Sequence, residues 1–175
     1  MKFHTIDLEG AYVIEPEPLE DERGFFARSF CSKEFKDHGL DFSIVQSSIS
    51  YNKKNGTLRG MHYQIAPFQE EKLVSCIRGA IYDVIIDLRS DSRTYRKWFS
   101  IELAVKNYRM LYIPKGFAHG FQTLEDDTAV FYQISESYHP ECARIIRWDD
   151  PAFGIKWPKT KVRIMSERDL CGQVG

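Results

Sequence analysis

The stretch KLVSCIRGAIYDVIIDL, residues 72–88, decides the fold class of this chain. β-Branched and other apolar residues are frequent in residues 72–77, and the dipeptide Arg78-Gly79 separates them from a second run, residues 80–88. A glycine between two strand-like runs is typical of a tight turn, so the stretch predicts a β-hairpin. The second run alternates between two sets of side chains, as the two faces of a strand require: Ala80, Tyr82, Val84, Ile86 and Leu88 against Ile81, Asp83, Ile85 and Asp87.

Further strand-like runs recur along the chain, separated by Gly, Asn, Asp or Pro. Aromatic residues, which favour strands, make up 14% of the sequence. The number of these runs predicts an all-β fold in which a closed barrel or two packed sheets remove exposed edges. The other expected strands cover residues 12–14, 26–30, 44–50, 60–63, 98–103, 109–113, 120–123, 129–135 and 143–147.

Outside the sheets, the sequence predicts only short peripheral helices. The clearest covers Lys33–His38, where Ser32 is expected to cap the N-terminus and Gly39 to adopt the left-handed conformation that ends a helix. From about residue 149 the composition changes, because prolines interrupt regular ladders. We expect this segment to form a C-terminal cover on a single domain of residues 1–175, with Trp157 as its anchor.

The charge balance argues against several classes of partner. Twenty-four Lys and Arg oppose 25 Asp and Glu, so the net charge of -1 gives no global attraction to nucleic acid or to an anionic membrane. No run approaches the roughly 18 apolar residues of a membrane span, and no export signal is evident. The four cysteines are widely spaced, as reduced thiols often are, so we expect a cytoplasmic protein.

The segment GTLRGMHYQ, residues 56–64, holds the first candidate site residues. His62 and Gln64 share one face of an expected strand, and Arg59 lies three positions earlier. A histidine in this position can equally be a hydrogen-bonded core residue. Lys72 opens the next strand and would ordinarily be a solvated charge. If that strand pairs beside residues 60–63, its ammonium would face the same hollow as His62.

The segment PKGFAHG, residues 114–120, is typical of a tight turn that delivers His119 onto a strand. Together with GMHYQ it resembles the two motifs of the cupin superfamily, whose members wrap a double-stranded β-helix, or jelly roll, around a central cavity. Metal-binding cupins supply a His-x-His pair and a Glu from the first motif and another His from the second. Here Gln64 replaces the second histidine of the pair, and the Lys72 ammonium would repel a divalent cation. The sequence therefore predicts a site without metal.

A lysine, a histidine and a nearby acid suit the inversion of a carbon next to a ketone. Abstracting the proton needs a base with a pKa of about 7 and a donor aimed at the developing enolate oxygen, which His62 and Lys72 would supply. A hydroxyl on the opposite face would return a proton, and Tyr132 is the candidate. A carboxylate would orient the histidine, and Asp83 and Asp169 are both open for that role.

Eight short motifs follow one another along the chain. They are DERGFFARSF (21–30), VQ (45–46), GTLRGMHYQ (56–64), EKLVSCIRGAIYDVIIDLRSDSRTY (71–95), LYIPKGFAHGFQTL (111–124), VFYQ (130–133), WDDPAFGIKWP (148–158) and SERD (166–169). In this order they resemble the dTDP-4-dehydrorhamnose 3,5-epimerase family over nearly the full length. The resemblance implies an isomerase acting on a nucleotide-linked 4-keto-6-deoxyhexose, as in dTDP-rhamnose synthesis for lipopolysaccharide or O-antigen.

The resemblance also implies an assembly and a set of roles. The family forms homodimers of jelly-roll subunits that use neither a metal nor an organic cofactor. The catalytic roles would fall on His62 as the base, Asp169 as its carboxylate partner, Lys72 beside the enolate oxygen and Tyr132 as the opposing acid. The substrate-binding residues would be Arg59 and, contributed across the dimer, Arg23 at the diphosphate, His119 near the sugar, and Phe26 and Gln46 at the nucleotide.

Two positions depart from the family pattern. Ser47-Ser48 follows VQ where many members have Asp-Asn, and Ala143-Arg144 stands where an acid is frequent. They leave open which nucleotide is bound (dTDP, CDP or another) and whether C3 alone or both C3 and C5 are inverted. Three other hypotheses remain: a nucleotide-sugar 3,4-ketoisomerase, a metal-dependent cupin oxygenase or isomerase, and a sugar-binding module without catalysis.

Overall fold

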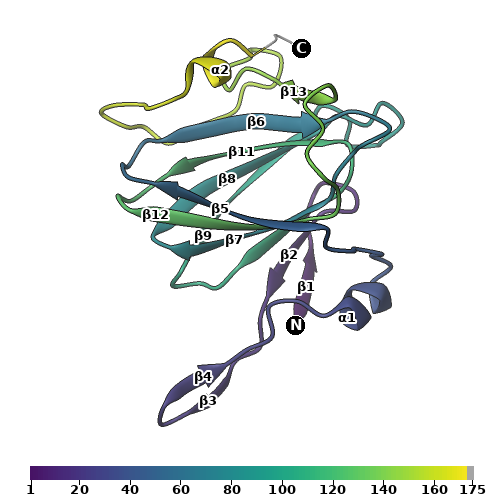
Figure 1. The fold of residues 1–175 in the computed structure, drawn as a ribbon, viewed down its shortest axis with the longest axis vertical. Helices are drawn as coiled ribbons and strands as arrows, with labels where there is room; N and C mark the ends of the chain where they lie inside the picture. Colours follow the sequence, from purple (N-terminus) through teal and green to yellow (C-terminus); the bar gives the residue numbers. More distant parts are fainter. Residues whose placement is uncertain (173–175) are drawn as a thin grey trace.

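Two antiparallel β-sheets packed against each other form the body of the computed structural model, which describes residues 1–172 (Figure 1). The six-stranded sheet has the order β1-β2-β10-β7-β12-β5, and the five-stranded sheet has the order β13-β6-β11-β8-β9. The predicted all-β, jelly-roll class is thereby confirmed. The strands of these sheets are β1 (Lys2–Thr5), β2 (Tyr12–Glu15), β5 (Gln46–Asn52), β6 (Leu58–Gln64), β7 (Lys72–Arg78), β8 (Ala80–Asp87), β9 (Trp98–Ala104), β10 (Met110–Ile113), β11 (Phe117–Thr123), β12 (Thr128–Ile134) and β13 (Ala143–Ile145).

The alternation predicted for residues 80–88 sorts the side chains of β8 between two apolar layers. Ile81 and Ile85 point into the core between the sheets, where they join Val74 and Val130 from the facing sheet. Val84 and Ile86 point the other way, into a second cluster under the C-terminal segment. Both faces of β8 are therefore covered, which explains why the strand is apolar almost throughout.

The predicted hairpin between residues 72–77 and 80–88 is wrong, although both runs are strands. β7 pairs with β10 and β12, whereas β8 pairs with β9 and β11 in the other sheet. Gly79 carries the chain between the sheets with a φ of +74°, and a Cβ there would lie 2.5 Å from Thr128 Oγ1. Period-two patterning shows which side chains share a face, but it does not identify the neighbouring strand.

The helix α1 (Ser32–Asp37) is short and peripheral, as predicted. It packs on one end of the six-stranded sheet, where the buried ring of Phe35 contacts Tyr112. Gly39 follows it with a φ of +76°, in the expected left-handed conformation. The expected cap is wrong, because Ser32 is the first helical residue and Cys31 is the N-cap, whose side chain makes no capping hydrogen bond.

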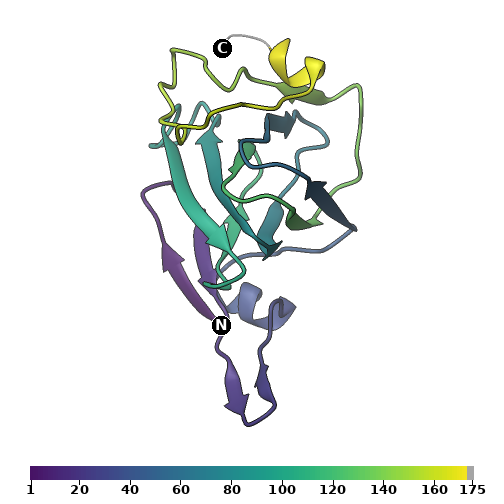
Figure 2. The same ribbon diagram turned by 90° about the vertical axis from the view of Figure 1, so that its left-hand side faces the viewer.

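Two segments extend the molecule in opposite directions (Figures 1 and 2). At one end, β3 (Leu19–Asp21) and β4 (Gly24–Phe26) form a projecting hairpin, so the strand predicted for residues 26–30 ends at its first residue. β1 and β3 were not predicted. At the other end, the segment after residue 149, including α2 (Glu167–Leu170), covers the five-stranded sheet, and Trp157 Nε1 donates to the Trp148 carbonyl at 2.7 Å. With four and six residues, the two helices of the described chain are far too short to cross a membrane.

Candidate active site

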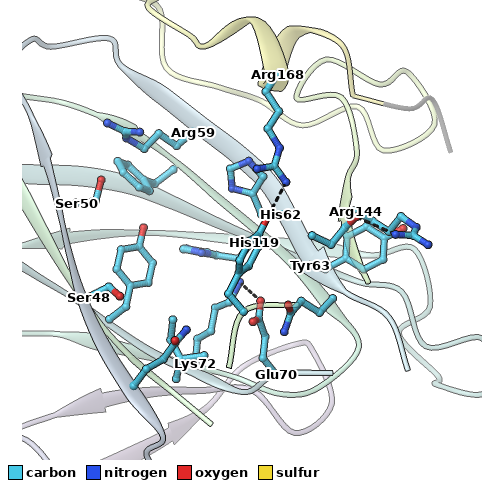
Figure 3. Close-up of a pocket in the computed structure, with 17 residues that line it drawn as sticks. Ser48, Ser50, Arg59, His62, Tyr63, Glu70, Lys72, His119, Arg144 and Arg168 are labelled. Atoms are coloured by element: carbon cyan, nitrogen blue, oxygen red, sulfur yellow. Dashed lines mark hydrogen bonds and ion pairs between the residues drawn. The ribbon is translucent and has the colours of Figure 1, made fainter. Parts of the chain in front are cut away.

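A cavity of about 330 Å³ lies between the two sheets and is lined by side chains from both (Figure 3). The five-stranded sheet contributes Arg59, His62, Tyr63, Gln64, His119, Phe121, Ala143 and Arg144, and the six-stranded sheet contributes Gln46, Ser48, Ser50, Lys72, Tyr132 and Ile134. Glu70, Tyr138 and Arg168 lie outside these strands and complete the lining. Seven of the nine predicted site residues thus lie at or beside this cavity, with Asp169 reaching it through His62.

A β-bulge explains how Arg59 and His62 both reach the cavity. Residues three apart on a regular strand point to opposite faces. Here His119 pairs with His62 and Phe121 pairs with Arg59, so two residues of β6 stand opposite the single residue Gly120. This extra residue reverses the alternation and brings both side chains to the same side. A Cβ on Gly60 would lie 2.5 Å from the Gly120 Cα, so glycine is required for the close approach.

His62 and Asp169 form a hydrogen-bonded pair at the rim of the cavity. His62 Nε2 lies 2.6 Å from Asp169 Oδ1, and 42% of the histidine side chain is exposed, against 6% for the aspartate. Asp169 sits in α2, where its backbone N–H is capped by the Ser166 hydroxyl. Burial alone would raise the pKa of Asp169, but hydrogen bonds from His62 and Ser166 outweigh it and lower that pKa below its ordinary value. An ionised carboxylate therefore faces the imidazole.

Lys72 lies on the opposite wall. The predicted pairing of its strand with residues 60–63 is wrong, because β6 pairs with β11 and β13 while β7 belongs to the other sheet. Lys72 nevertheless shares the cavity with His62, since the two strands face each other across it. The Lys72 side chain is 9% exposed, and its Nζ makes an ion pair of 2.8 Å with Glu70 Oε1 (Figure 3).

A second histidine–carboxylate pair lies deeper in the cavity. His119 Nε2 is 2.7 Å from Asp83 Oδ1, and both side chains are almost fully buried. Burial raises the pKa of Asp83, although His119 opposes the shift. The alternative in which Asp83 orients His62 is therefore wrong, and Asp169 occupies that position. Tyr132 lies beside this pair, 5.9 Å from His119 between ring centroids, and burial raises its pKa well above the ordinary value.

The remaining predicted residues divide into two groups. Arg59 lies at the cavity with Gln46, and its Nε donates to Asn52 Oδ1 at 2.7 Å. Asn52 is 2% exposed and also donates to the Thr128 carbonyl, so it anchors the guanidinium from behind. Arg23 and Phe26 are exposed on the β3–β4 hairpin, which projects away from the sandwich, and neither lines the cavity of this chain (Figure 1).

Several residues of the cavity escaped prediction. Glu70 lies in an acidic run that is typical of a surface loop, although its position two residues before Lys72 could have indicated a pair. Asn52 does not line the cavity and carried no signal, because its contact with Arg59 joins β5 of one sheet to β6 of the other. Arg168 lies one residue before Asp169 and donates to the Tyr138 hydroxyl at 3.2 Å. Its place in the motif SERD was the available clue.

Gln64 is held as part of the wall. Its side-chain amide donates to the Phe68 and Ser137 carbonyls, and its Oε1 accepts from the His139 N–H at 2.6 Å. These bonds fix the loop that carries Tyr138 over the cavity. Within residues 1–172, no three His, Cys, Asp or Glu side chains are arranged to hold a metal ion.

A jelly roll whose cavity combines a His–Asp pair, an ammonium and a phenol defines a cupin-like protein equipped for acid–base chemistry. The family model described as dTDP-4-dehydrorhamnose 3,5-epimerase matches residues 5–173. The chain therefore belongs to the dTDP-4-dehydrorhamnose 3,5-epimerase family and is an isomerase. This membership favours epimerisation over the ketoisomerase, metal-dependent and non-catalytic hypotheses.

Individual relatives agree with the family assignment. The chain is 43% identical to a dTDP-4-dehydrorhamnose 3,5-epimerase from Sinorhizobium fredii over 97% of this chain and 87% of the relative. The crystal structure of the Bacillus anthracis epimerase, with TDP and pyrophosphate bound, superposes with a TM-score of 0.95 at 39% identity, covering 99% of this chain and 98% of that one. The Legionella pneumophila enzyme, in complex with dTDP-4-keto-L-rhamnose, gives a TM-score of 0.92 at 35% identity, covering 98% and 90%.

Proposed function

We propose that this protein inverts C3 and C5 of a dTDP-linked 4-keto-6-deoxyhexose by removing a proton on one face of the sugar and returning one on the other. The observation that carries the proposal is the placement of His62 on one sheet and of Lys72 and Tyr132 on the facing sheet, with one cavity between them. The dTDP sugar is the ligand of the Legionella relative. A ring between the two walls would present its opposite faces to His62 and Tyr132.

In the first step, His62 removes the proton from the carbon next to the C4 ketone. The ionised Asp169 holds the imidazole in position and stabilises the imidazolium that forms. The electron pair of the broken C–H bond moves to the C4 oxygen as an enolate. The Lys72 ammonium would donate a hydrogen bond to this oxygen, where negative charge develops.

In the second step, Tyr132 donates its phenolic proton to the same carbon from the opposite face, and the C4 ketone is restored. The pKa of Tyr132 is raised by burial, so the hydroxyl carries its proton at neutral pH and is ready to donate. The side chain of His62 is 42% exposed, which lets the base exchange its proton with water between turnovers. After each inversion the Tyr132 phenolate takes up a proton from water in the cavity and His62 releases the proton that it gained, so the same two groups can act on C3 and then on C5.

The diphosphate would bind at Arg59, whose planar guanidinium suits paired hydrogen bonds to phosphate oxygens. We place Gln46 at the nucleotide and His119 near the sugar. Arg23 and Phe26 would complete the site of a second subunit, because they lie on a hairpin that leaves its own subunit. The outer face of the six-stranded sheet exposes Ile49, Tyr51 and Ile77, the kind of apolar surface that a homodimer buries. Sedimentation analysis is expected to give twice the 20.4 kDa chain mass.

Each proton transfer in this scheme is assigned to a side chain of the protein, so we propose that no metal or organic cofactor takes part. The free thiols and the nucleotide-sugar substrate fit a cytoplasmic location. The deciding experiment incubates the enzyme with dTDP-4-keto-6-deoxyglucose in deuterated water and follows C3 and C5 by NMR. Deuterium should enter both positions with formation of the epimer, at a rate that treatment with EDTA leaves unchanged.

Two results of this experiment would contradict the proposal. Exchange at neither carbon would exclude epimerisation, and migration of the keto group to C3 would indicate a 3,4-ketoisomerase. Exchange confined to C3 would limit the reaction to one centre.

A further inference from the structure

The acidic residue Glu70 is a component of the cavity to which the scheme above gives no role. It precedes β7 and lines the cavity with a side chain that is only 11% exposed. Its Oε1 lies 2.8 Å from Lys72 Nζ, and the lysine side chain is 9% exposed. In the described chain, Glu70 is the one carboxylate within ion-pair distance of Lys72. Figure 3 shows the pair next to His119 and below His62.

A lysine ammonium needs such a partner to act as a fixed electrostatic group. Its four-carbon stem carries roughly 2 kcal/mol of rotamer entropy, so an unrestrained Nζ samples many positions. The ammonium has three N–H donors, of which Glu70 accepts one, and the others stay available for a ligand in the cavity. An unpaired charge in a buried site is also costly, because the surroundings solvate it poorly.

Asp83 is the obvious alternative partner, since it lies on β8 close enough to interact electrostatically with Lys72. Its Oδ1, however, is bonded to His119, and its Oδ2 has no hydrogen-bond partner among the described residues. Asp83 therefore serves the second histidine, and the direct contact to the ammonium comes from Glu70.

We propose that Glu70 is a positioning residue that fixes the Lys72 ammonium with its free N–H groups directed at the substrate carbonyl oxygen. The inference rests on the proposed function, because it assumes an enolate whose oxygen Lys72 stabilises. Glu70 then acts through Lys72 and need not touch the substrate. Its loss should lower kcat, since the enolate exists only along the reaction path, and should leave KM almost unchanged.

The test compares Glu70→Gln with Glu71→Gln, the same change at the neighbouring residue. Glu71 accepts a hydrogen bond from Tyr112 and does not line the cavity, so its variant should keep kcat within about twofold. Glu70→Gln should lower kcat between about tenfold and a hundredfold, the range that a charge-assisted hydrogen bond represents, with KM changed less than about threefold. Glu70→Asp, which restores the carboxylate one methylene shorter, should recover part of the loss. It also provides a second variant if Glu70→Gln folds poorly in a thermal melt.

The same substitution in a Lys72→Met background separates positioning from direct action. If Glu70 works through Lys72, adding Glu70→Gln to Lys72→Met should not lower kcat further. A full additional loss in that background, an unchanged kcat in the single variant, or a rise in KM alone would overturn the proposal. Any of these results, obtained with a wild-type enzyme that exchanges deuterium at C3 and C5, leaves the proposed function intact. Absence of exchange in the wild type would instead remove the function itself.

Discussion

The two walls of the cavity carry different chemistry, although both are antiparallel sheets from one chain. The five-stranded wall holds histidines paired with carboxylates, His62 with Asp169 and His119 with Asp83. The six-stranded wall holds Lys72 and Tyr132, a cation and a phenol. In the proposed scheme, a base therefore faces an acid across the cavity. The comparison teaches that a sandwich provides the opposed groups that inversion of a carbon requires, because its two inner faces look at each other.

The largest effect is expected from removing the base. His62→Ala should lower deuterium exchange at C3 and C5 by at least about 10³-fold, since general base catalysis contributes roughly 10²–10⁴ and no other histidine can take its place at the rim. NMR of the substrate in deuterated water measures the rate. His4→Ala is the matched control, because His4 is half exposed on β1, an edge strand that is remote from the cavity in the sheet order. This variant should catalyse deuterium exchange at the wild-type rate. Exchange at that rate in His62→Ala would place the base elsewhere.

The next effect is expected on the opposite wall. Lys72→Ala should lower kcat by about 10²–10³-fold, the usual loss when a donor to a developing oxyanion is removed. Steady-state kinetics with the 4-keto sugar measure it. Lys54→Ala, which removes an exposed lysine ion-paired with Asp126, should leave kcat unchanged. A loss of less than about threefold in Lys72→Ala would show that the six-stranded wall does not stabilise the enolate.

A smaller effect should fall on binding. Asn52→Ala removes the anchor behind Arg59, so the guanidinium should hold the diphosphate less firmly and KM should rise about tenfold, equivalent to one charge-assisted hydrogen bond. The value of kcat should change less than about twofold, because the proposed scheme assigns the reacting carbons to other residues. Asn55→Ala offers the same change at an exposed position three residues away. Equal KM values for the two variants would show that anchoring Arg59 through Asn52 does not support binding of the substrate.

The smallest effect on catalysis is expected at Asp87, which lies four residues after Asp83 on β8 but does not line the cavity. Burial would raise its pKa, but hydrogen bonds from Arg89, Ser92 and Thr94 outweigh it and lower the pKa to about 2. A pKa below the unfolded value stabilises the fold at neutral pH, by roughly 2 kcal/mol for a shift of this size.

Asp87→Asn should therefore reduce the free energy of unfolding by roughly 2 kcal/mol at pH 7 without changing kcat. The difference from the wild type should shrink as the pH falls from about 4 towards 2, where the wild-type carboxylate becomes protonated. Urea titrations across this range measure it, with the exposed Asp91→Asn as control. A difference that stays constant over the range would contradict the assigned role of the charge.

The sequence predicts which side chains share a face of a strand better than it predicts which strands pair with each other. Alternation placed Ile81 and Ile85 on one side of β8 and Val84 on the other, as the two apolar layers confirm. It assigned β7 to the wrong partner, because Gly79 permits a hairpin as well as a crossover between sheets. Sheet membership depends on long-range contacts that local periodicity does not contain.

In the candidate site, too, the shared cavity was predicted correctly and the strand pairing was not. His62, Lys72 and Tyr132 were predicted to share a hollow and do line one cavity. The strand neighbours expected for Lys72 were wrong, because the walls face each other and are not adjacent in one sheet. Glu70 was missed since an acidic run before a strand has the composition of a solvated loop. Its burial is a tertiary property.

The central claim is that His62 and Tyr132 act on opposite faces of one ring, and deuterium labelling of Tyr132→Phe tests it most directly. The variant keeps the ring but loses the proton donor. Because the half-exposed His62 can still remove a proton and return a deuteron on its own face, NMR should show deuterium at C3 and C5 of unchanged configuration, with epimer formation reduced by about 10²-fold or more. Epimer formation at the wild-type rate in Tyr132→Phe would contradict the account.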